Sequence, residues 1–156
     1  MVLEEIAKNP SFKKGKIEDL EPWQRELVEA AKEARGHAVP PYSQYFVGAA
    51  VLAESGKIYQ GANYESAVYT PTVHAEMMAI NQAIFAGERK FKALAVYVGK
   101  GPGVSCGLCR QKAYEADTNM QMIGANEDGE VIIASIENLL PFGFSSKELG
   151  IDISKY

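Results

Sequence analysis

The sequence predicts an α/β fold in which one mixed β-sheet is flanked by helices. Three observations carry this prediction. The chain has 156 residues, of which 47% are hydrophobic and 23% charged, the balance of one folded domain. Its predicted elements follow in the order α-β-β-α-β-α-β-β-α. A hairpin is followed by a β-α-β unit, so antiparallel and parallel strand pairs must share the sheet.

The first half of that order consists of a helix and a hairpin. The helix is expected from Pro22 to a stop at Gly36, because apolar residues recur within it at three- and four-residue spacing. A turn at 54–56 then joins two strands, at 45–53 and 57–62. These two strands are expected to pair directly.

The second half alternates helices with strands. A helix over 74–86 precedes a nearly continuous apolar run at 93–98, which is typical of a strand buried on both faces. A glycine-rich loop then leads into a second helix. The remaining elements are that helix at 106–116, strands at 121–125 and 130–134, and a short helix at 136–140. The five strands and their helices fill residues 21–156 as one domain, after an N-terminal tail or short helix at 1–20.

Composition and charge disfavour several classes of protein. The net charge is −4, whereas proteins that bind a nucleic-acid backbone are usually basic. No apolar run approaches the roughly 20 residues of a membrane span, and the charged N-terminus is unlike a signal peptide. Two closely spaced cysteines do not form the framework of a disulfide-rich secreted domain. We therefore expect a cytoplasmic protein with neither a nucleic-acid nor a membrane partner.

Two short motifs at predicted helix starts could together hold a metal ion. Cys106 and Cys109 have the C-x-x-C spacing of a metal-binding knuckle, and the helix dipole is expected to lower the pKa of both thiols. By itself this pair is equally typical of a redox dithiol or of two inert thiols. His74 begins the preceding helix, and in a right-handed β-α-β arrangement both helix starts emerge at the same sheet edge.

Three protein ligands leave the fourth position of a tetrahedral zinc ion open, which is the pattern of a catalytic site. We therefore expect one Zn²⁺ per chain. In the alternative reading His37 closes the site as a fourth ligand. Glu76, two residues after His74, is the candidate general acid and base; for an isolated glutamate, a helix N-terminal preference would be the more common explanation.

These residues resemble the zinc-dependent cytidine deaminases, in which an H-A-E motif precedes a C-x-x-C pair. The resemblance covers about residues 22–149 and is carried by four segments in the family's order. They are Tyr42–Val51 (similar to Y-S-x-F-x-V-G-A-A-L), Asn63–Tyr69 (N-x-E-N-A-x-Y), Cys106–Gln111 (C-G-A-C-R-Q) and Leu139–Phe144 (L-L-P-x-x-F).

The resemblance implies a three-layer fold and the hydrolytic deamination of cytidine or deoxycytidine to the uridine form plus ammonia, as in pyrimidine salvage. It also implies a homotetramer with shared active sites, as in other single-domain members. His74, Cys106 and Cys109 would hold zinc, and Glu76 would transfer the proton.

The resemblance assigns further residues to the substrate. Asn63 and Glu65 would bind the ribose hydroxyl, and Tyr45 would lie near the base. The backbone at Ala75 would read the pyrimidine edge, and the Cys106 N–H would support the developing oxyanion. Phe144 matches an aromatic residue that reaches across from a neighbouring subunit. For Asn63 and Glu65 the alternative is an Asx-turn beside a surface carboxylate, and for the aromatic residues it is ordinary packing.

The sequence departs from the pattern of the small family members at four places. His74 replaces a cysteine and Met77 an arginine; because a neutral imidazole removes one negative charge from the zinc site, the arginine is no longer needed to offset it. Ser105 replaces a proline, Ser66 an asparagine and Tyr45 a phenylalanine. These three changes leave open the identity of the preferred nucleoside.

Two other functions remain open. The first keeps the chemistry but acts on a modified or antibiotic cytosine nucleoside, or on RNA, although the negative net charge disfavours RNA. The second is a non-catalytic zinc-binding or dithiol redox module.

Overall fold

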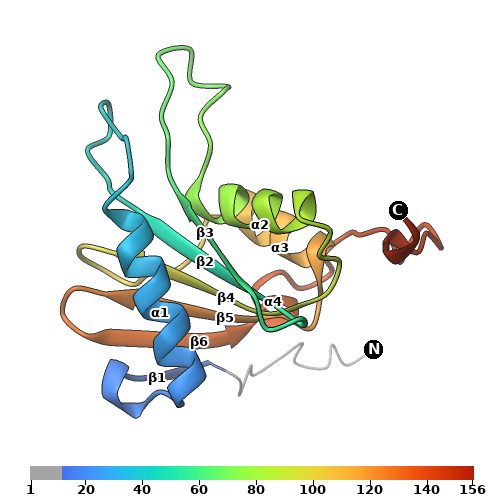
Figure 1. Ribbon diagram of the computed structural model, residues 1–156, viewed down its shortest axis with the longest axis horizontal. Coiled ribbons are helices and arrows are strands. Elements are labelled where there is room, and N and C mark those ends of the chain that lie inside the picture. Colours follow the sequence, from blue (N-terminus) through green and yellow to red (C-terminus); the bar gives the residue numbers. More distant parts are fainter. Residues whose placement is uncertain (1–11) are drawn as a thin grey trace, which may run out of the picture.

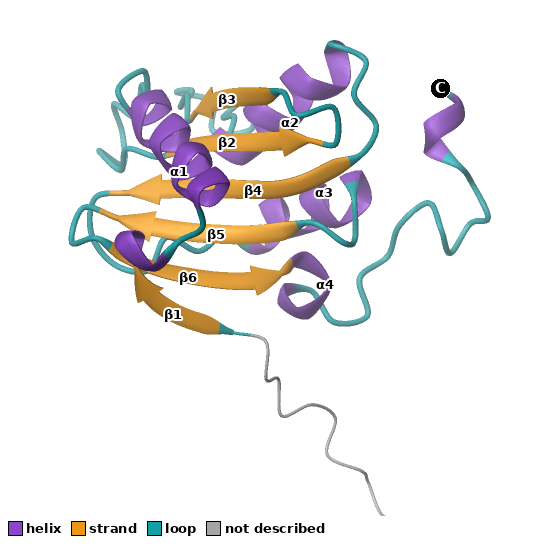
Figure 2. Cartoon of the chain, turned by 60° about the horizontal axis from the view of Figure 1, so that its bottom comes forward, coloured by secondary structure: helices purple, strands orange, loops and turns teal. Residues whose placement is uncertain are grey.

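A six-stranded mixed sheet forms the middle layer of the computed structural model, which describes residues 12–156 (Figures 1 and 2). The strands are β1 (Lys13–Lys16), β2 (Gly48–Ala53), β3 (Ile58–Ala62), β4 (Phe91–Val98), β5 (Gln121–Asn126) and β6 (Glu130–Ser135). They lie in the order β1-β6-β5-β4-β2-β3, in which only the β4–β5 pair is parallel.

Helices cover both faces of this sheet, which gives the three layers that the family resemblance implied. The helices are α1 (Pro22–Arg35), α2 (Ala75–Phe85), α3 (Gly107–Ala116) and α4 (Ile136–Leu139), with 3-10 turns η1 (Ile17–Asp19) and η2 (Ile153–Lys155). Helix α1 lies alone on one face, and α2, α3 and α4 lie on the other (Figure 2). No helix among the described residues has the length and apolar character needed to cross a membrane.

From Ala93 to Val98 the central strand β4 is apolar, and side chains on both of its faces are buried. In β4, Leu94 and Val96 belong to the core beneath α2 and α3, whereas Ala93 and Ala95 belong to the core beneath α1. Side chains alternate between the two faces of a strand, so each core receives every second residue. This burial accounts for the continuous apolar run that the sequence contains at β4.

Strands β3, β4 and β5 all run in the same direction, which determines where the chain can build a site. Strand β2 lies between β3 and β4 and is antiparallel to both, so β3 and β4 have the same direction; β5 is parallel to β4. Their arrows point the same way in Figure 2. The loops that lead from β3 to α2 and from β4 to α3 therefore leave the same edge of the sheet.

The predicted order of elements is confirmed, with two corrections at the N-terminal side. The predicted strand at 45–53 begins only at Gly48, because residues 45–47 form part of a loop. Lys13–Lys16 was expected in a tail or short helix but forms a sixth strand, antiparallel to β6. A strand of four residues that includes three lysines has no apolar alternation to reveal it, although lysine suits an exposed sheet edge. Residues 1–11 of the expected tail lie outside the described residues.

Gly61 allows helix α2 to lie unusually close to the edge strand β3. A Cβ atom added at Gly61 would lie 2.3 Å from the Ala75 carbonyl oxygen and 2.5 Å from the Ala79 amide nitrogen. Both are backbone atoms of α2, so only a movement of the helix could relieve the contact. Gly61 therefore determines the distance between the sheet and the start of α2.

Replacing Gly61 with alanine is expected to lower the free energy of unfolding by about 1–3 kcal/mol or more, as overpacking does. The measurement is denaturant unfolding of the purified protein. Gly107→Ala is the matched control, because a Cβ at Gly107 would meet nothing within 4 Å; its stability should be unchanged or slightly raised. Equal stability of the two variants would contradict the close packing of α2.

Candidate functional site

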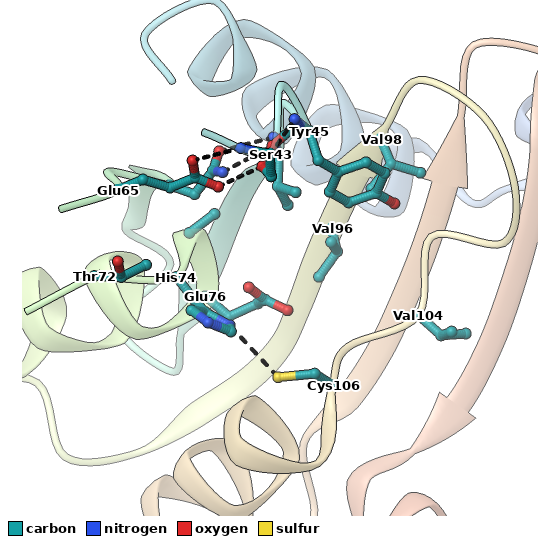
Figure 3. Close-up of a pocket in the computed structure, with 13 residues that line it drawn as sticks. Ser43, Tyr45, Glu65, Thr72, His74, Glu76, Val96, Val98, Val104 and Cys106 are labelled. Atoms are coloured by element: carbon teal, nitrogen blue, oxygen red, sulfur yellow. Dashed lines mark hydrogen bonds between the residues drawn. The ribbon is translucent and has the colours of Figure 1, made fainter. Parts of the chain in front are cut away.

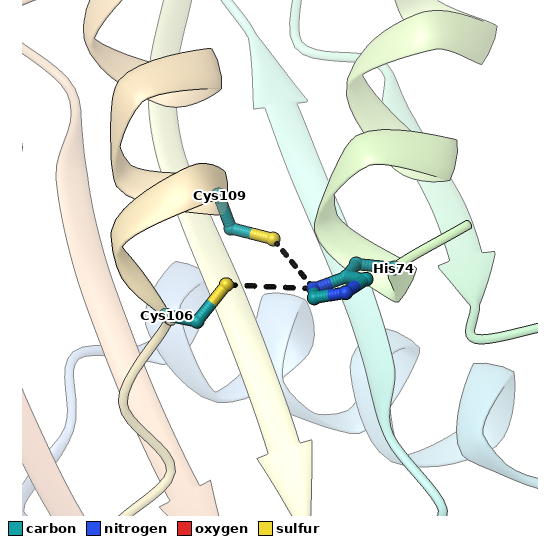
Figure 4. A group of neighbouring side chains, drawn as sticks. All are labelled: His74, Cys106 and Cys109. Atoms are coloured by element: carbon teal, nitrogen blue, oxygen red, sulfur yellow. Dashed lines mark hydrogen bonds between the residues drawn. The ribbon is translucent and has the colours of Figure 1, made fainter. Parts of the chain in front are cut away.

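The structure brings the three candidate metal ligands together at one edge of the sheet (Figure 4). The Sγ atoms of Cys106 and Cys109 lie 3.4 Å and 3.3 Å from Nδ1 of His74. His74 is the N-cap residue of α2, and Cys106 is the N-cap residue of α3. Because both helices begin after strands that run in the same direction, their first residues meet although they are far apart in the sequence.

The spacing and chemistry of these donors fit a zinc ion. A tetrahedral Zn²⁺ with bonds of about 2.3 Å to sulfur and about 2.0–2.1 Å to nitrogen holds its sulfur and nitrogen donors roughly 3.6 Å apart. All three donor atoms lie within 4.8 Å of one another. His37 is exposed and lines a separate groove beside β3, so it does not close the site as a fourth ligand. The described residues thus supply three donors and leave the fourth position free.

Burial makes ionisation of the Cys109 thiol unfavourable unless a positive charge lies beside it. Desolvation raises the pKa of this thiol, and the nearby Glu76 carboxylate raises it further. The expectation that the helix dipole lowers the pKa of both thiols is therefore wrong for Cys109, because the loss of hydration outweighs the helix end. A redox dithiol needs a thiolate that forms readily, whereas a divalent cation can itself stabilise the thiolate at this position.

A cavity of about 260 Å³ opens next to the metal ligands (Figure 3). Such a volume is close to the lower end of small-molecule sites, about 300–1,000 Å³. Its lining consists of Ser43, Tyr45, Val47, Asn63, Glu65, Thr72, His74, Ala75, Glu76, Val96, Val98, Val104 and Cys106. The cavity thus contains seven of the nine residues that the sequence assigned to the site, and Cys109 lies buried behind it.

Glu76 is a buried acidic residue in the lining of this cavity. It lies in the first turn of α2, is 5% exposed, and extends between the His74 ring and Val96 (Figure 3). Its place in the first helical turn agrees with the helix N-terminal preference of a glutamate, and its side chain also lines the cavity. It can exchange a proton with a molecule held beside the metal.

Asn63 lines the cavity and also holds the neighbouring loop. Its Oδ1 atom accepts a hydrogen bond from the Val47 N–H at 2.9 Å, and its Nδ2 atom donates to the Tyr45 carbonyl oxygen at 2.8 Å. These bonds span 16 and 18 residues, so the local Asx-turn considered from the sequence is not what forms. One N–H of the amide remains for a ligand.

Glu65 anchors the same loop at its other end. Its carboxylate accepts hydrogen bonds at 3.0 Å from the backbone N–H groups of Tyr42 and Ser43, and a further one from the Ser43 hydroxyl. The hydrogen bonds from Ser43 lower the pKa of the Glu65 carboxyl, and the Tyr42 N–H adds to this effect. The segment 42–47 is therefore held by Glu65 at its start and by Asn63 at its end.

Phe144 is the one predicted site residue that lies away from both the cavity and the metal ligands. It is 59% exposed, and its carbonyl oxygen accepts a hydrogen bond of 2.7 Å from Gln111 on α3. The sequence pattern missed the apolar wall formed by Val96, Val98 and Val104. Its only signal was the position of these residues at the end of a buried strand and in the loop that follows.

His74→Ala is expected to lose bound zinc, whereas His37→Ala should retain one zinc per chain, because only His74 lies within reach of the two cysteines. Elemental analysis of the purified proteins measures this directly. The two variants remove the same side chain, so general effects of losing an imidazole are matched. Full zinc content in His74→Ala, or loss of zinc in His37→Ala, would contradict the assigned ligand set.

Comparisons with known proteins agree with this geometry. Residues 21–125 match the model of the cytidine and deoxycytidylate deaminase zinc-binding region. The chain is 42% identical over 125 residues to a cytidine deaminase of Sporosarcina psychrophila, a match that covers 79% of this chain and 92% of that protein. A cytidine deaminase of Halalkalibacterium halodurans is 37% identical over 127 residues, with 79% and 95% covered.

The fold is also that of solved family members. The crystal structure of cytidine deaminase from Burkholderia pseudomallei superposes with a TM-score of 0.74 at 40% identity, covering 76% of this chain and 97% of that chain. The enzyme from Mycobacterium tuberculosis gives a TM-score of 0.67 at 27% identity, with 80% and 98% covered. By its matched zinc-binding region, its relatives and its fold, this chain belongs to the cytidine and deoxycytidylate deaminase family.

Proposed function

We propose that this protein is a zinc-dependent hydrolase that converts cytidine or deoxycytidine to uridine or deoxyuridine and releases ammonia. The observation that carries the proposal is the buried Glu76 carboxylate, which faces a small cavity beside three zinc ligands. The family relatives are named cytidine deaminases, which supports the same reaction. The reaction adds one water at C4 of the base and removes the exocyclic amine.

Zinc bound by His74, Cys106 and Cys109 would supply a water that loses a proton near neutral pH. The role of Glu76 follows from its position. It accepts that proton and delivers it to N3 of the base. It then moves the remaining proton of the added water from the hydroxyl at C4 to the departing amine. Both transfers use one carboxylate because attack and departure occur at the same carbon. A buried position keeps bulk water from competing for these protons.

The other lining residues orient the nucleoside. The free N–H of Asn63 and the Glu65 carboxylate can hydrogen-bond to a ribose hydroxyl, and the Tyr45 ring can lie against the base. Backbone groups at Ala75 and Cys106 lie beside the metal ligands, where they can read the pyrimidine edge and support negative charge on the oxygen at C4. Tyr45 and Ser105 are two of the positions at which the sequence departs from the family pattern. Tyr45 lines the cavity and Ser105 does not, so of the two only Tyr45 can contact a substrate held there.

Glu76→Gln is expected to retain zinc and to lower kcat for cytidine by about 10²–10⁴-fold or more, since it removes the general acid and base. Glu88→Gln is the control: this carboxylate accepts hydrogen bonds from Ser55 and Tyr59 and is not among the residues that line the cavity. Turnover is measured as ammonia release. A Glu76→Gln variant with near-parental turnover would overturn the proposed mechanism.

A substrate panel tests the identity of the substrate. The wild-type protein should prefer cytidine and deoxycytidine over nucleotides, 5-modified cytosine nucleosides and short RNA. Preference for a modified nucleoside would replace the proposed substrate while keeping the reaction. Preference for RNA, or no turnover of any member by the zinc-loaded protein, would refute the proposed function.

We also infer that the protein is a homotetramer with shared active sites that works in pyrimidine salvage in the cytoplasm. Three exposed apolar side chains on α3 and in the segment beside it support association between copies; they are Leu108, Phe142 and Phe144, together called the patch beside α3. This chain covers 92% and 97% of the length of two relatives, as expected for the single-domain class that the sequence resemblance links to a tetramer. Two cysteine ligands that must stay reduced favour the cytoplasm.

Light scattering is expected to give four times the 17.0 kDa mass of the chain. Phe142→Asp should dissociate the tetramer, because it places a charge in the patch beside α3, where the Phe142 side chain is 90% exposed in the single chain. Tyr156→Asp, which changes a similarly exposed aromatic residue at the C-terminus, should leave the mass unchanged. A fully active wild-type monomer would contradict the shared site.

A further inference from the structure

Arg35 lies outside the cavity, yet it joins two of the segments that form its walls. It is the last residue of α1, and its Nε atom donates a hydrogen bond of 2.9 Å to the Phe46 carbonyl oxygen. Its Nη1 atom pairs with the carboxylate of Glu127 in the turn between β5 and β6. The side chain is 24% exposed, so much of it is enclosed by these partners.

The guanidinium is also close to the start of the loop between β4 and α3. A Cβ atom added at Gly99 would lie 2.9 Å from Nη2 of Arg35, and the Gly99 carbonyl oxygen accepts a 3.2 Å hydrogen bond from the Glu127 N–H. Glu127 therefore contacts Arg35 through its side chain and Gly99 through its backbone. Arg35, Glu127 and Gly99 form one contiguous cluster.

Each segment in this cluster continues directly into the lining of the cavity. Phe46 stands between Tyr45 and Val47, and the side chains of both of these neighbours line the cavity. Gly99 follows Val98, another lining residue, and starts the loop that leads to the metal ligand Cys106. Arg35 thus stabilises the cavity wall from behind, with no atom of its own in the cavity lining.

The segment that Arg35 contacts has an unfavourable backbone conformation at one residue and is held by several side chains. Within it, Gln44 has a φ of 55°, a left-handed conformation that is unfavourable for a residue with a side chain. Asn63 holds the carbonyl of Tyr45 and the N–H of Val47, which leaves the Phe46 carbonyl between them to Arg35. Three consecutive residues are therefore each held by a side chain from another part of the fold.

We propose that Arg35, oriented by Glu127, is a positioning residue that holds segment 42–47 in the conformation that binds the nucleoside. The proposal rests on the proposed deaminase function for its consequence in catalysis. The planar guanidinium can donate to the Phe46 carbonyl and to Glu127 at the same time, whereas a lysine ammonium cannot reproduce this fixed fork. Loss of the cluster weakens substrate binding and leaves the metal and Glu76 in place.

Steady-state kinetics of the zinc-loaded protein test the catalytic consequence. Arg35→Met is expected to raise KM for cytidine about tenfold with kcat nearly unchanged, the effect of losing a hydrogen bond from a charged group. Arg35→Lys should restore part of the loss, and Glu127→Gln should show a smaller rise in KM. Lys32→Met is the control, because it removes a positive charge from the same helix at a residue that pairs with Glu29 and lies near the Tyr97 ring, and that has no hydrogen bond or ion pair with segment 42–47 among residues 12–156.

Hydrogen exchange of the same variants without substrate tests the structural part. Amides of residues 42–47 should exchange faster in Arg35→Met than in the wild type and in Lys32→Met, while those of β4 stay protected. Faster exchange with an unchanged KM would overturn the positioning role. Unchanged exchange would overturn the proposed support of the loop, whatever happens to KM.

These readouts separate the present proposal from the proposed function. If the wild-type protein does not deaminate cytidine, the proposed function fails, and hydrogen exchange still decides whether Arg35 holds segment 42–47. If the wild type is active and Arg35→Met changes kcat and zinc content as strongly as KM, the residue supports the whole fold rather than the loop, and the positioning role is refuted. Melting temperatures within a few degrees of wild type for Arg35→Lys and Glu127→Gln keep those two variants interpretable.

Discussion

The common direction of β3 and β4 is the constraint on which the rest of this site depends. Because β2 is inserted antiparallel between them, the two strands share a direction without being neighbours, and helices α2 and α3 begin at the same edge. His74 and Cys106 are the N-cap residues of those helices. The distance between them is thus determined by backbone packing, including the close approach of α2 at Gly61, rather than by flexible side chains.

The buried acidic groups of the site give a bound metal ion a structural role in addition to its chemical one. Cys109 is fully buried and Glu76 nearly so, and burial together with the nearby Glu76 carboxylate raises the pKa of the Cys109 thiol. A divalent cation at the three donors offsets both charges and allows the thiolate and the carboxylate to coexist. The same arrangement that serves a hydrolase is poorly suited to a dithiol redox centre, in which the thiolate must form without a metal.

Two polar residues of the cavity, Asn63 and Glu65, both line it and hold the neighbouring loop. Asn63 and Glu65 use most of their hydrogen-bonding capacity on the loop at 42–47 and keep only part of it for a ligand. Arg35 and Glu127 continue this support behind the cavity wall. The lining of the cavity is therefore preorganised by the fold, which reduces the ordering needed if a ligand binds there.

Local spacing in the sequence determined the order of the elements and predicted the candidate ligands His74, Cys106 and Cys109 together with Glu76, because helix starts, turns and short motifs depend on residues close together in the chain. The sixth strand at Lys13–Lys16 had no such local signal, since its pairing with β6 joins residues more than a hundred positions apart. Only the tertiary structure decided that Cys109 is buried beside Glu76 and that Phe144 lies outside the cavity of its own chain. It also decided that Arg35 contacts segment 42–47 from behind the cavity wall. Each of these depends on which distant segments share an environment, and that is a property of packing.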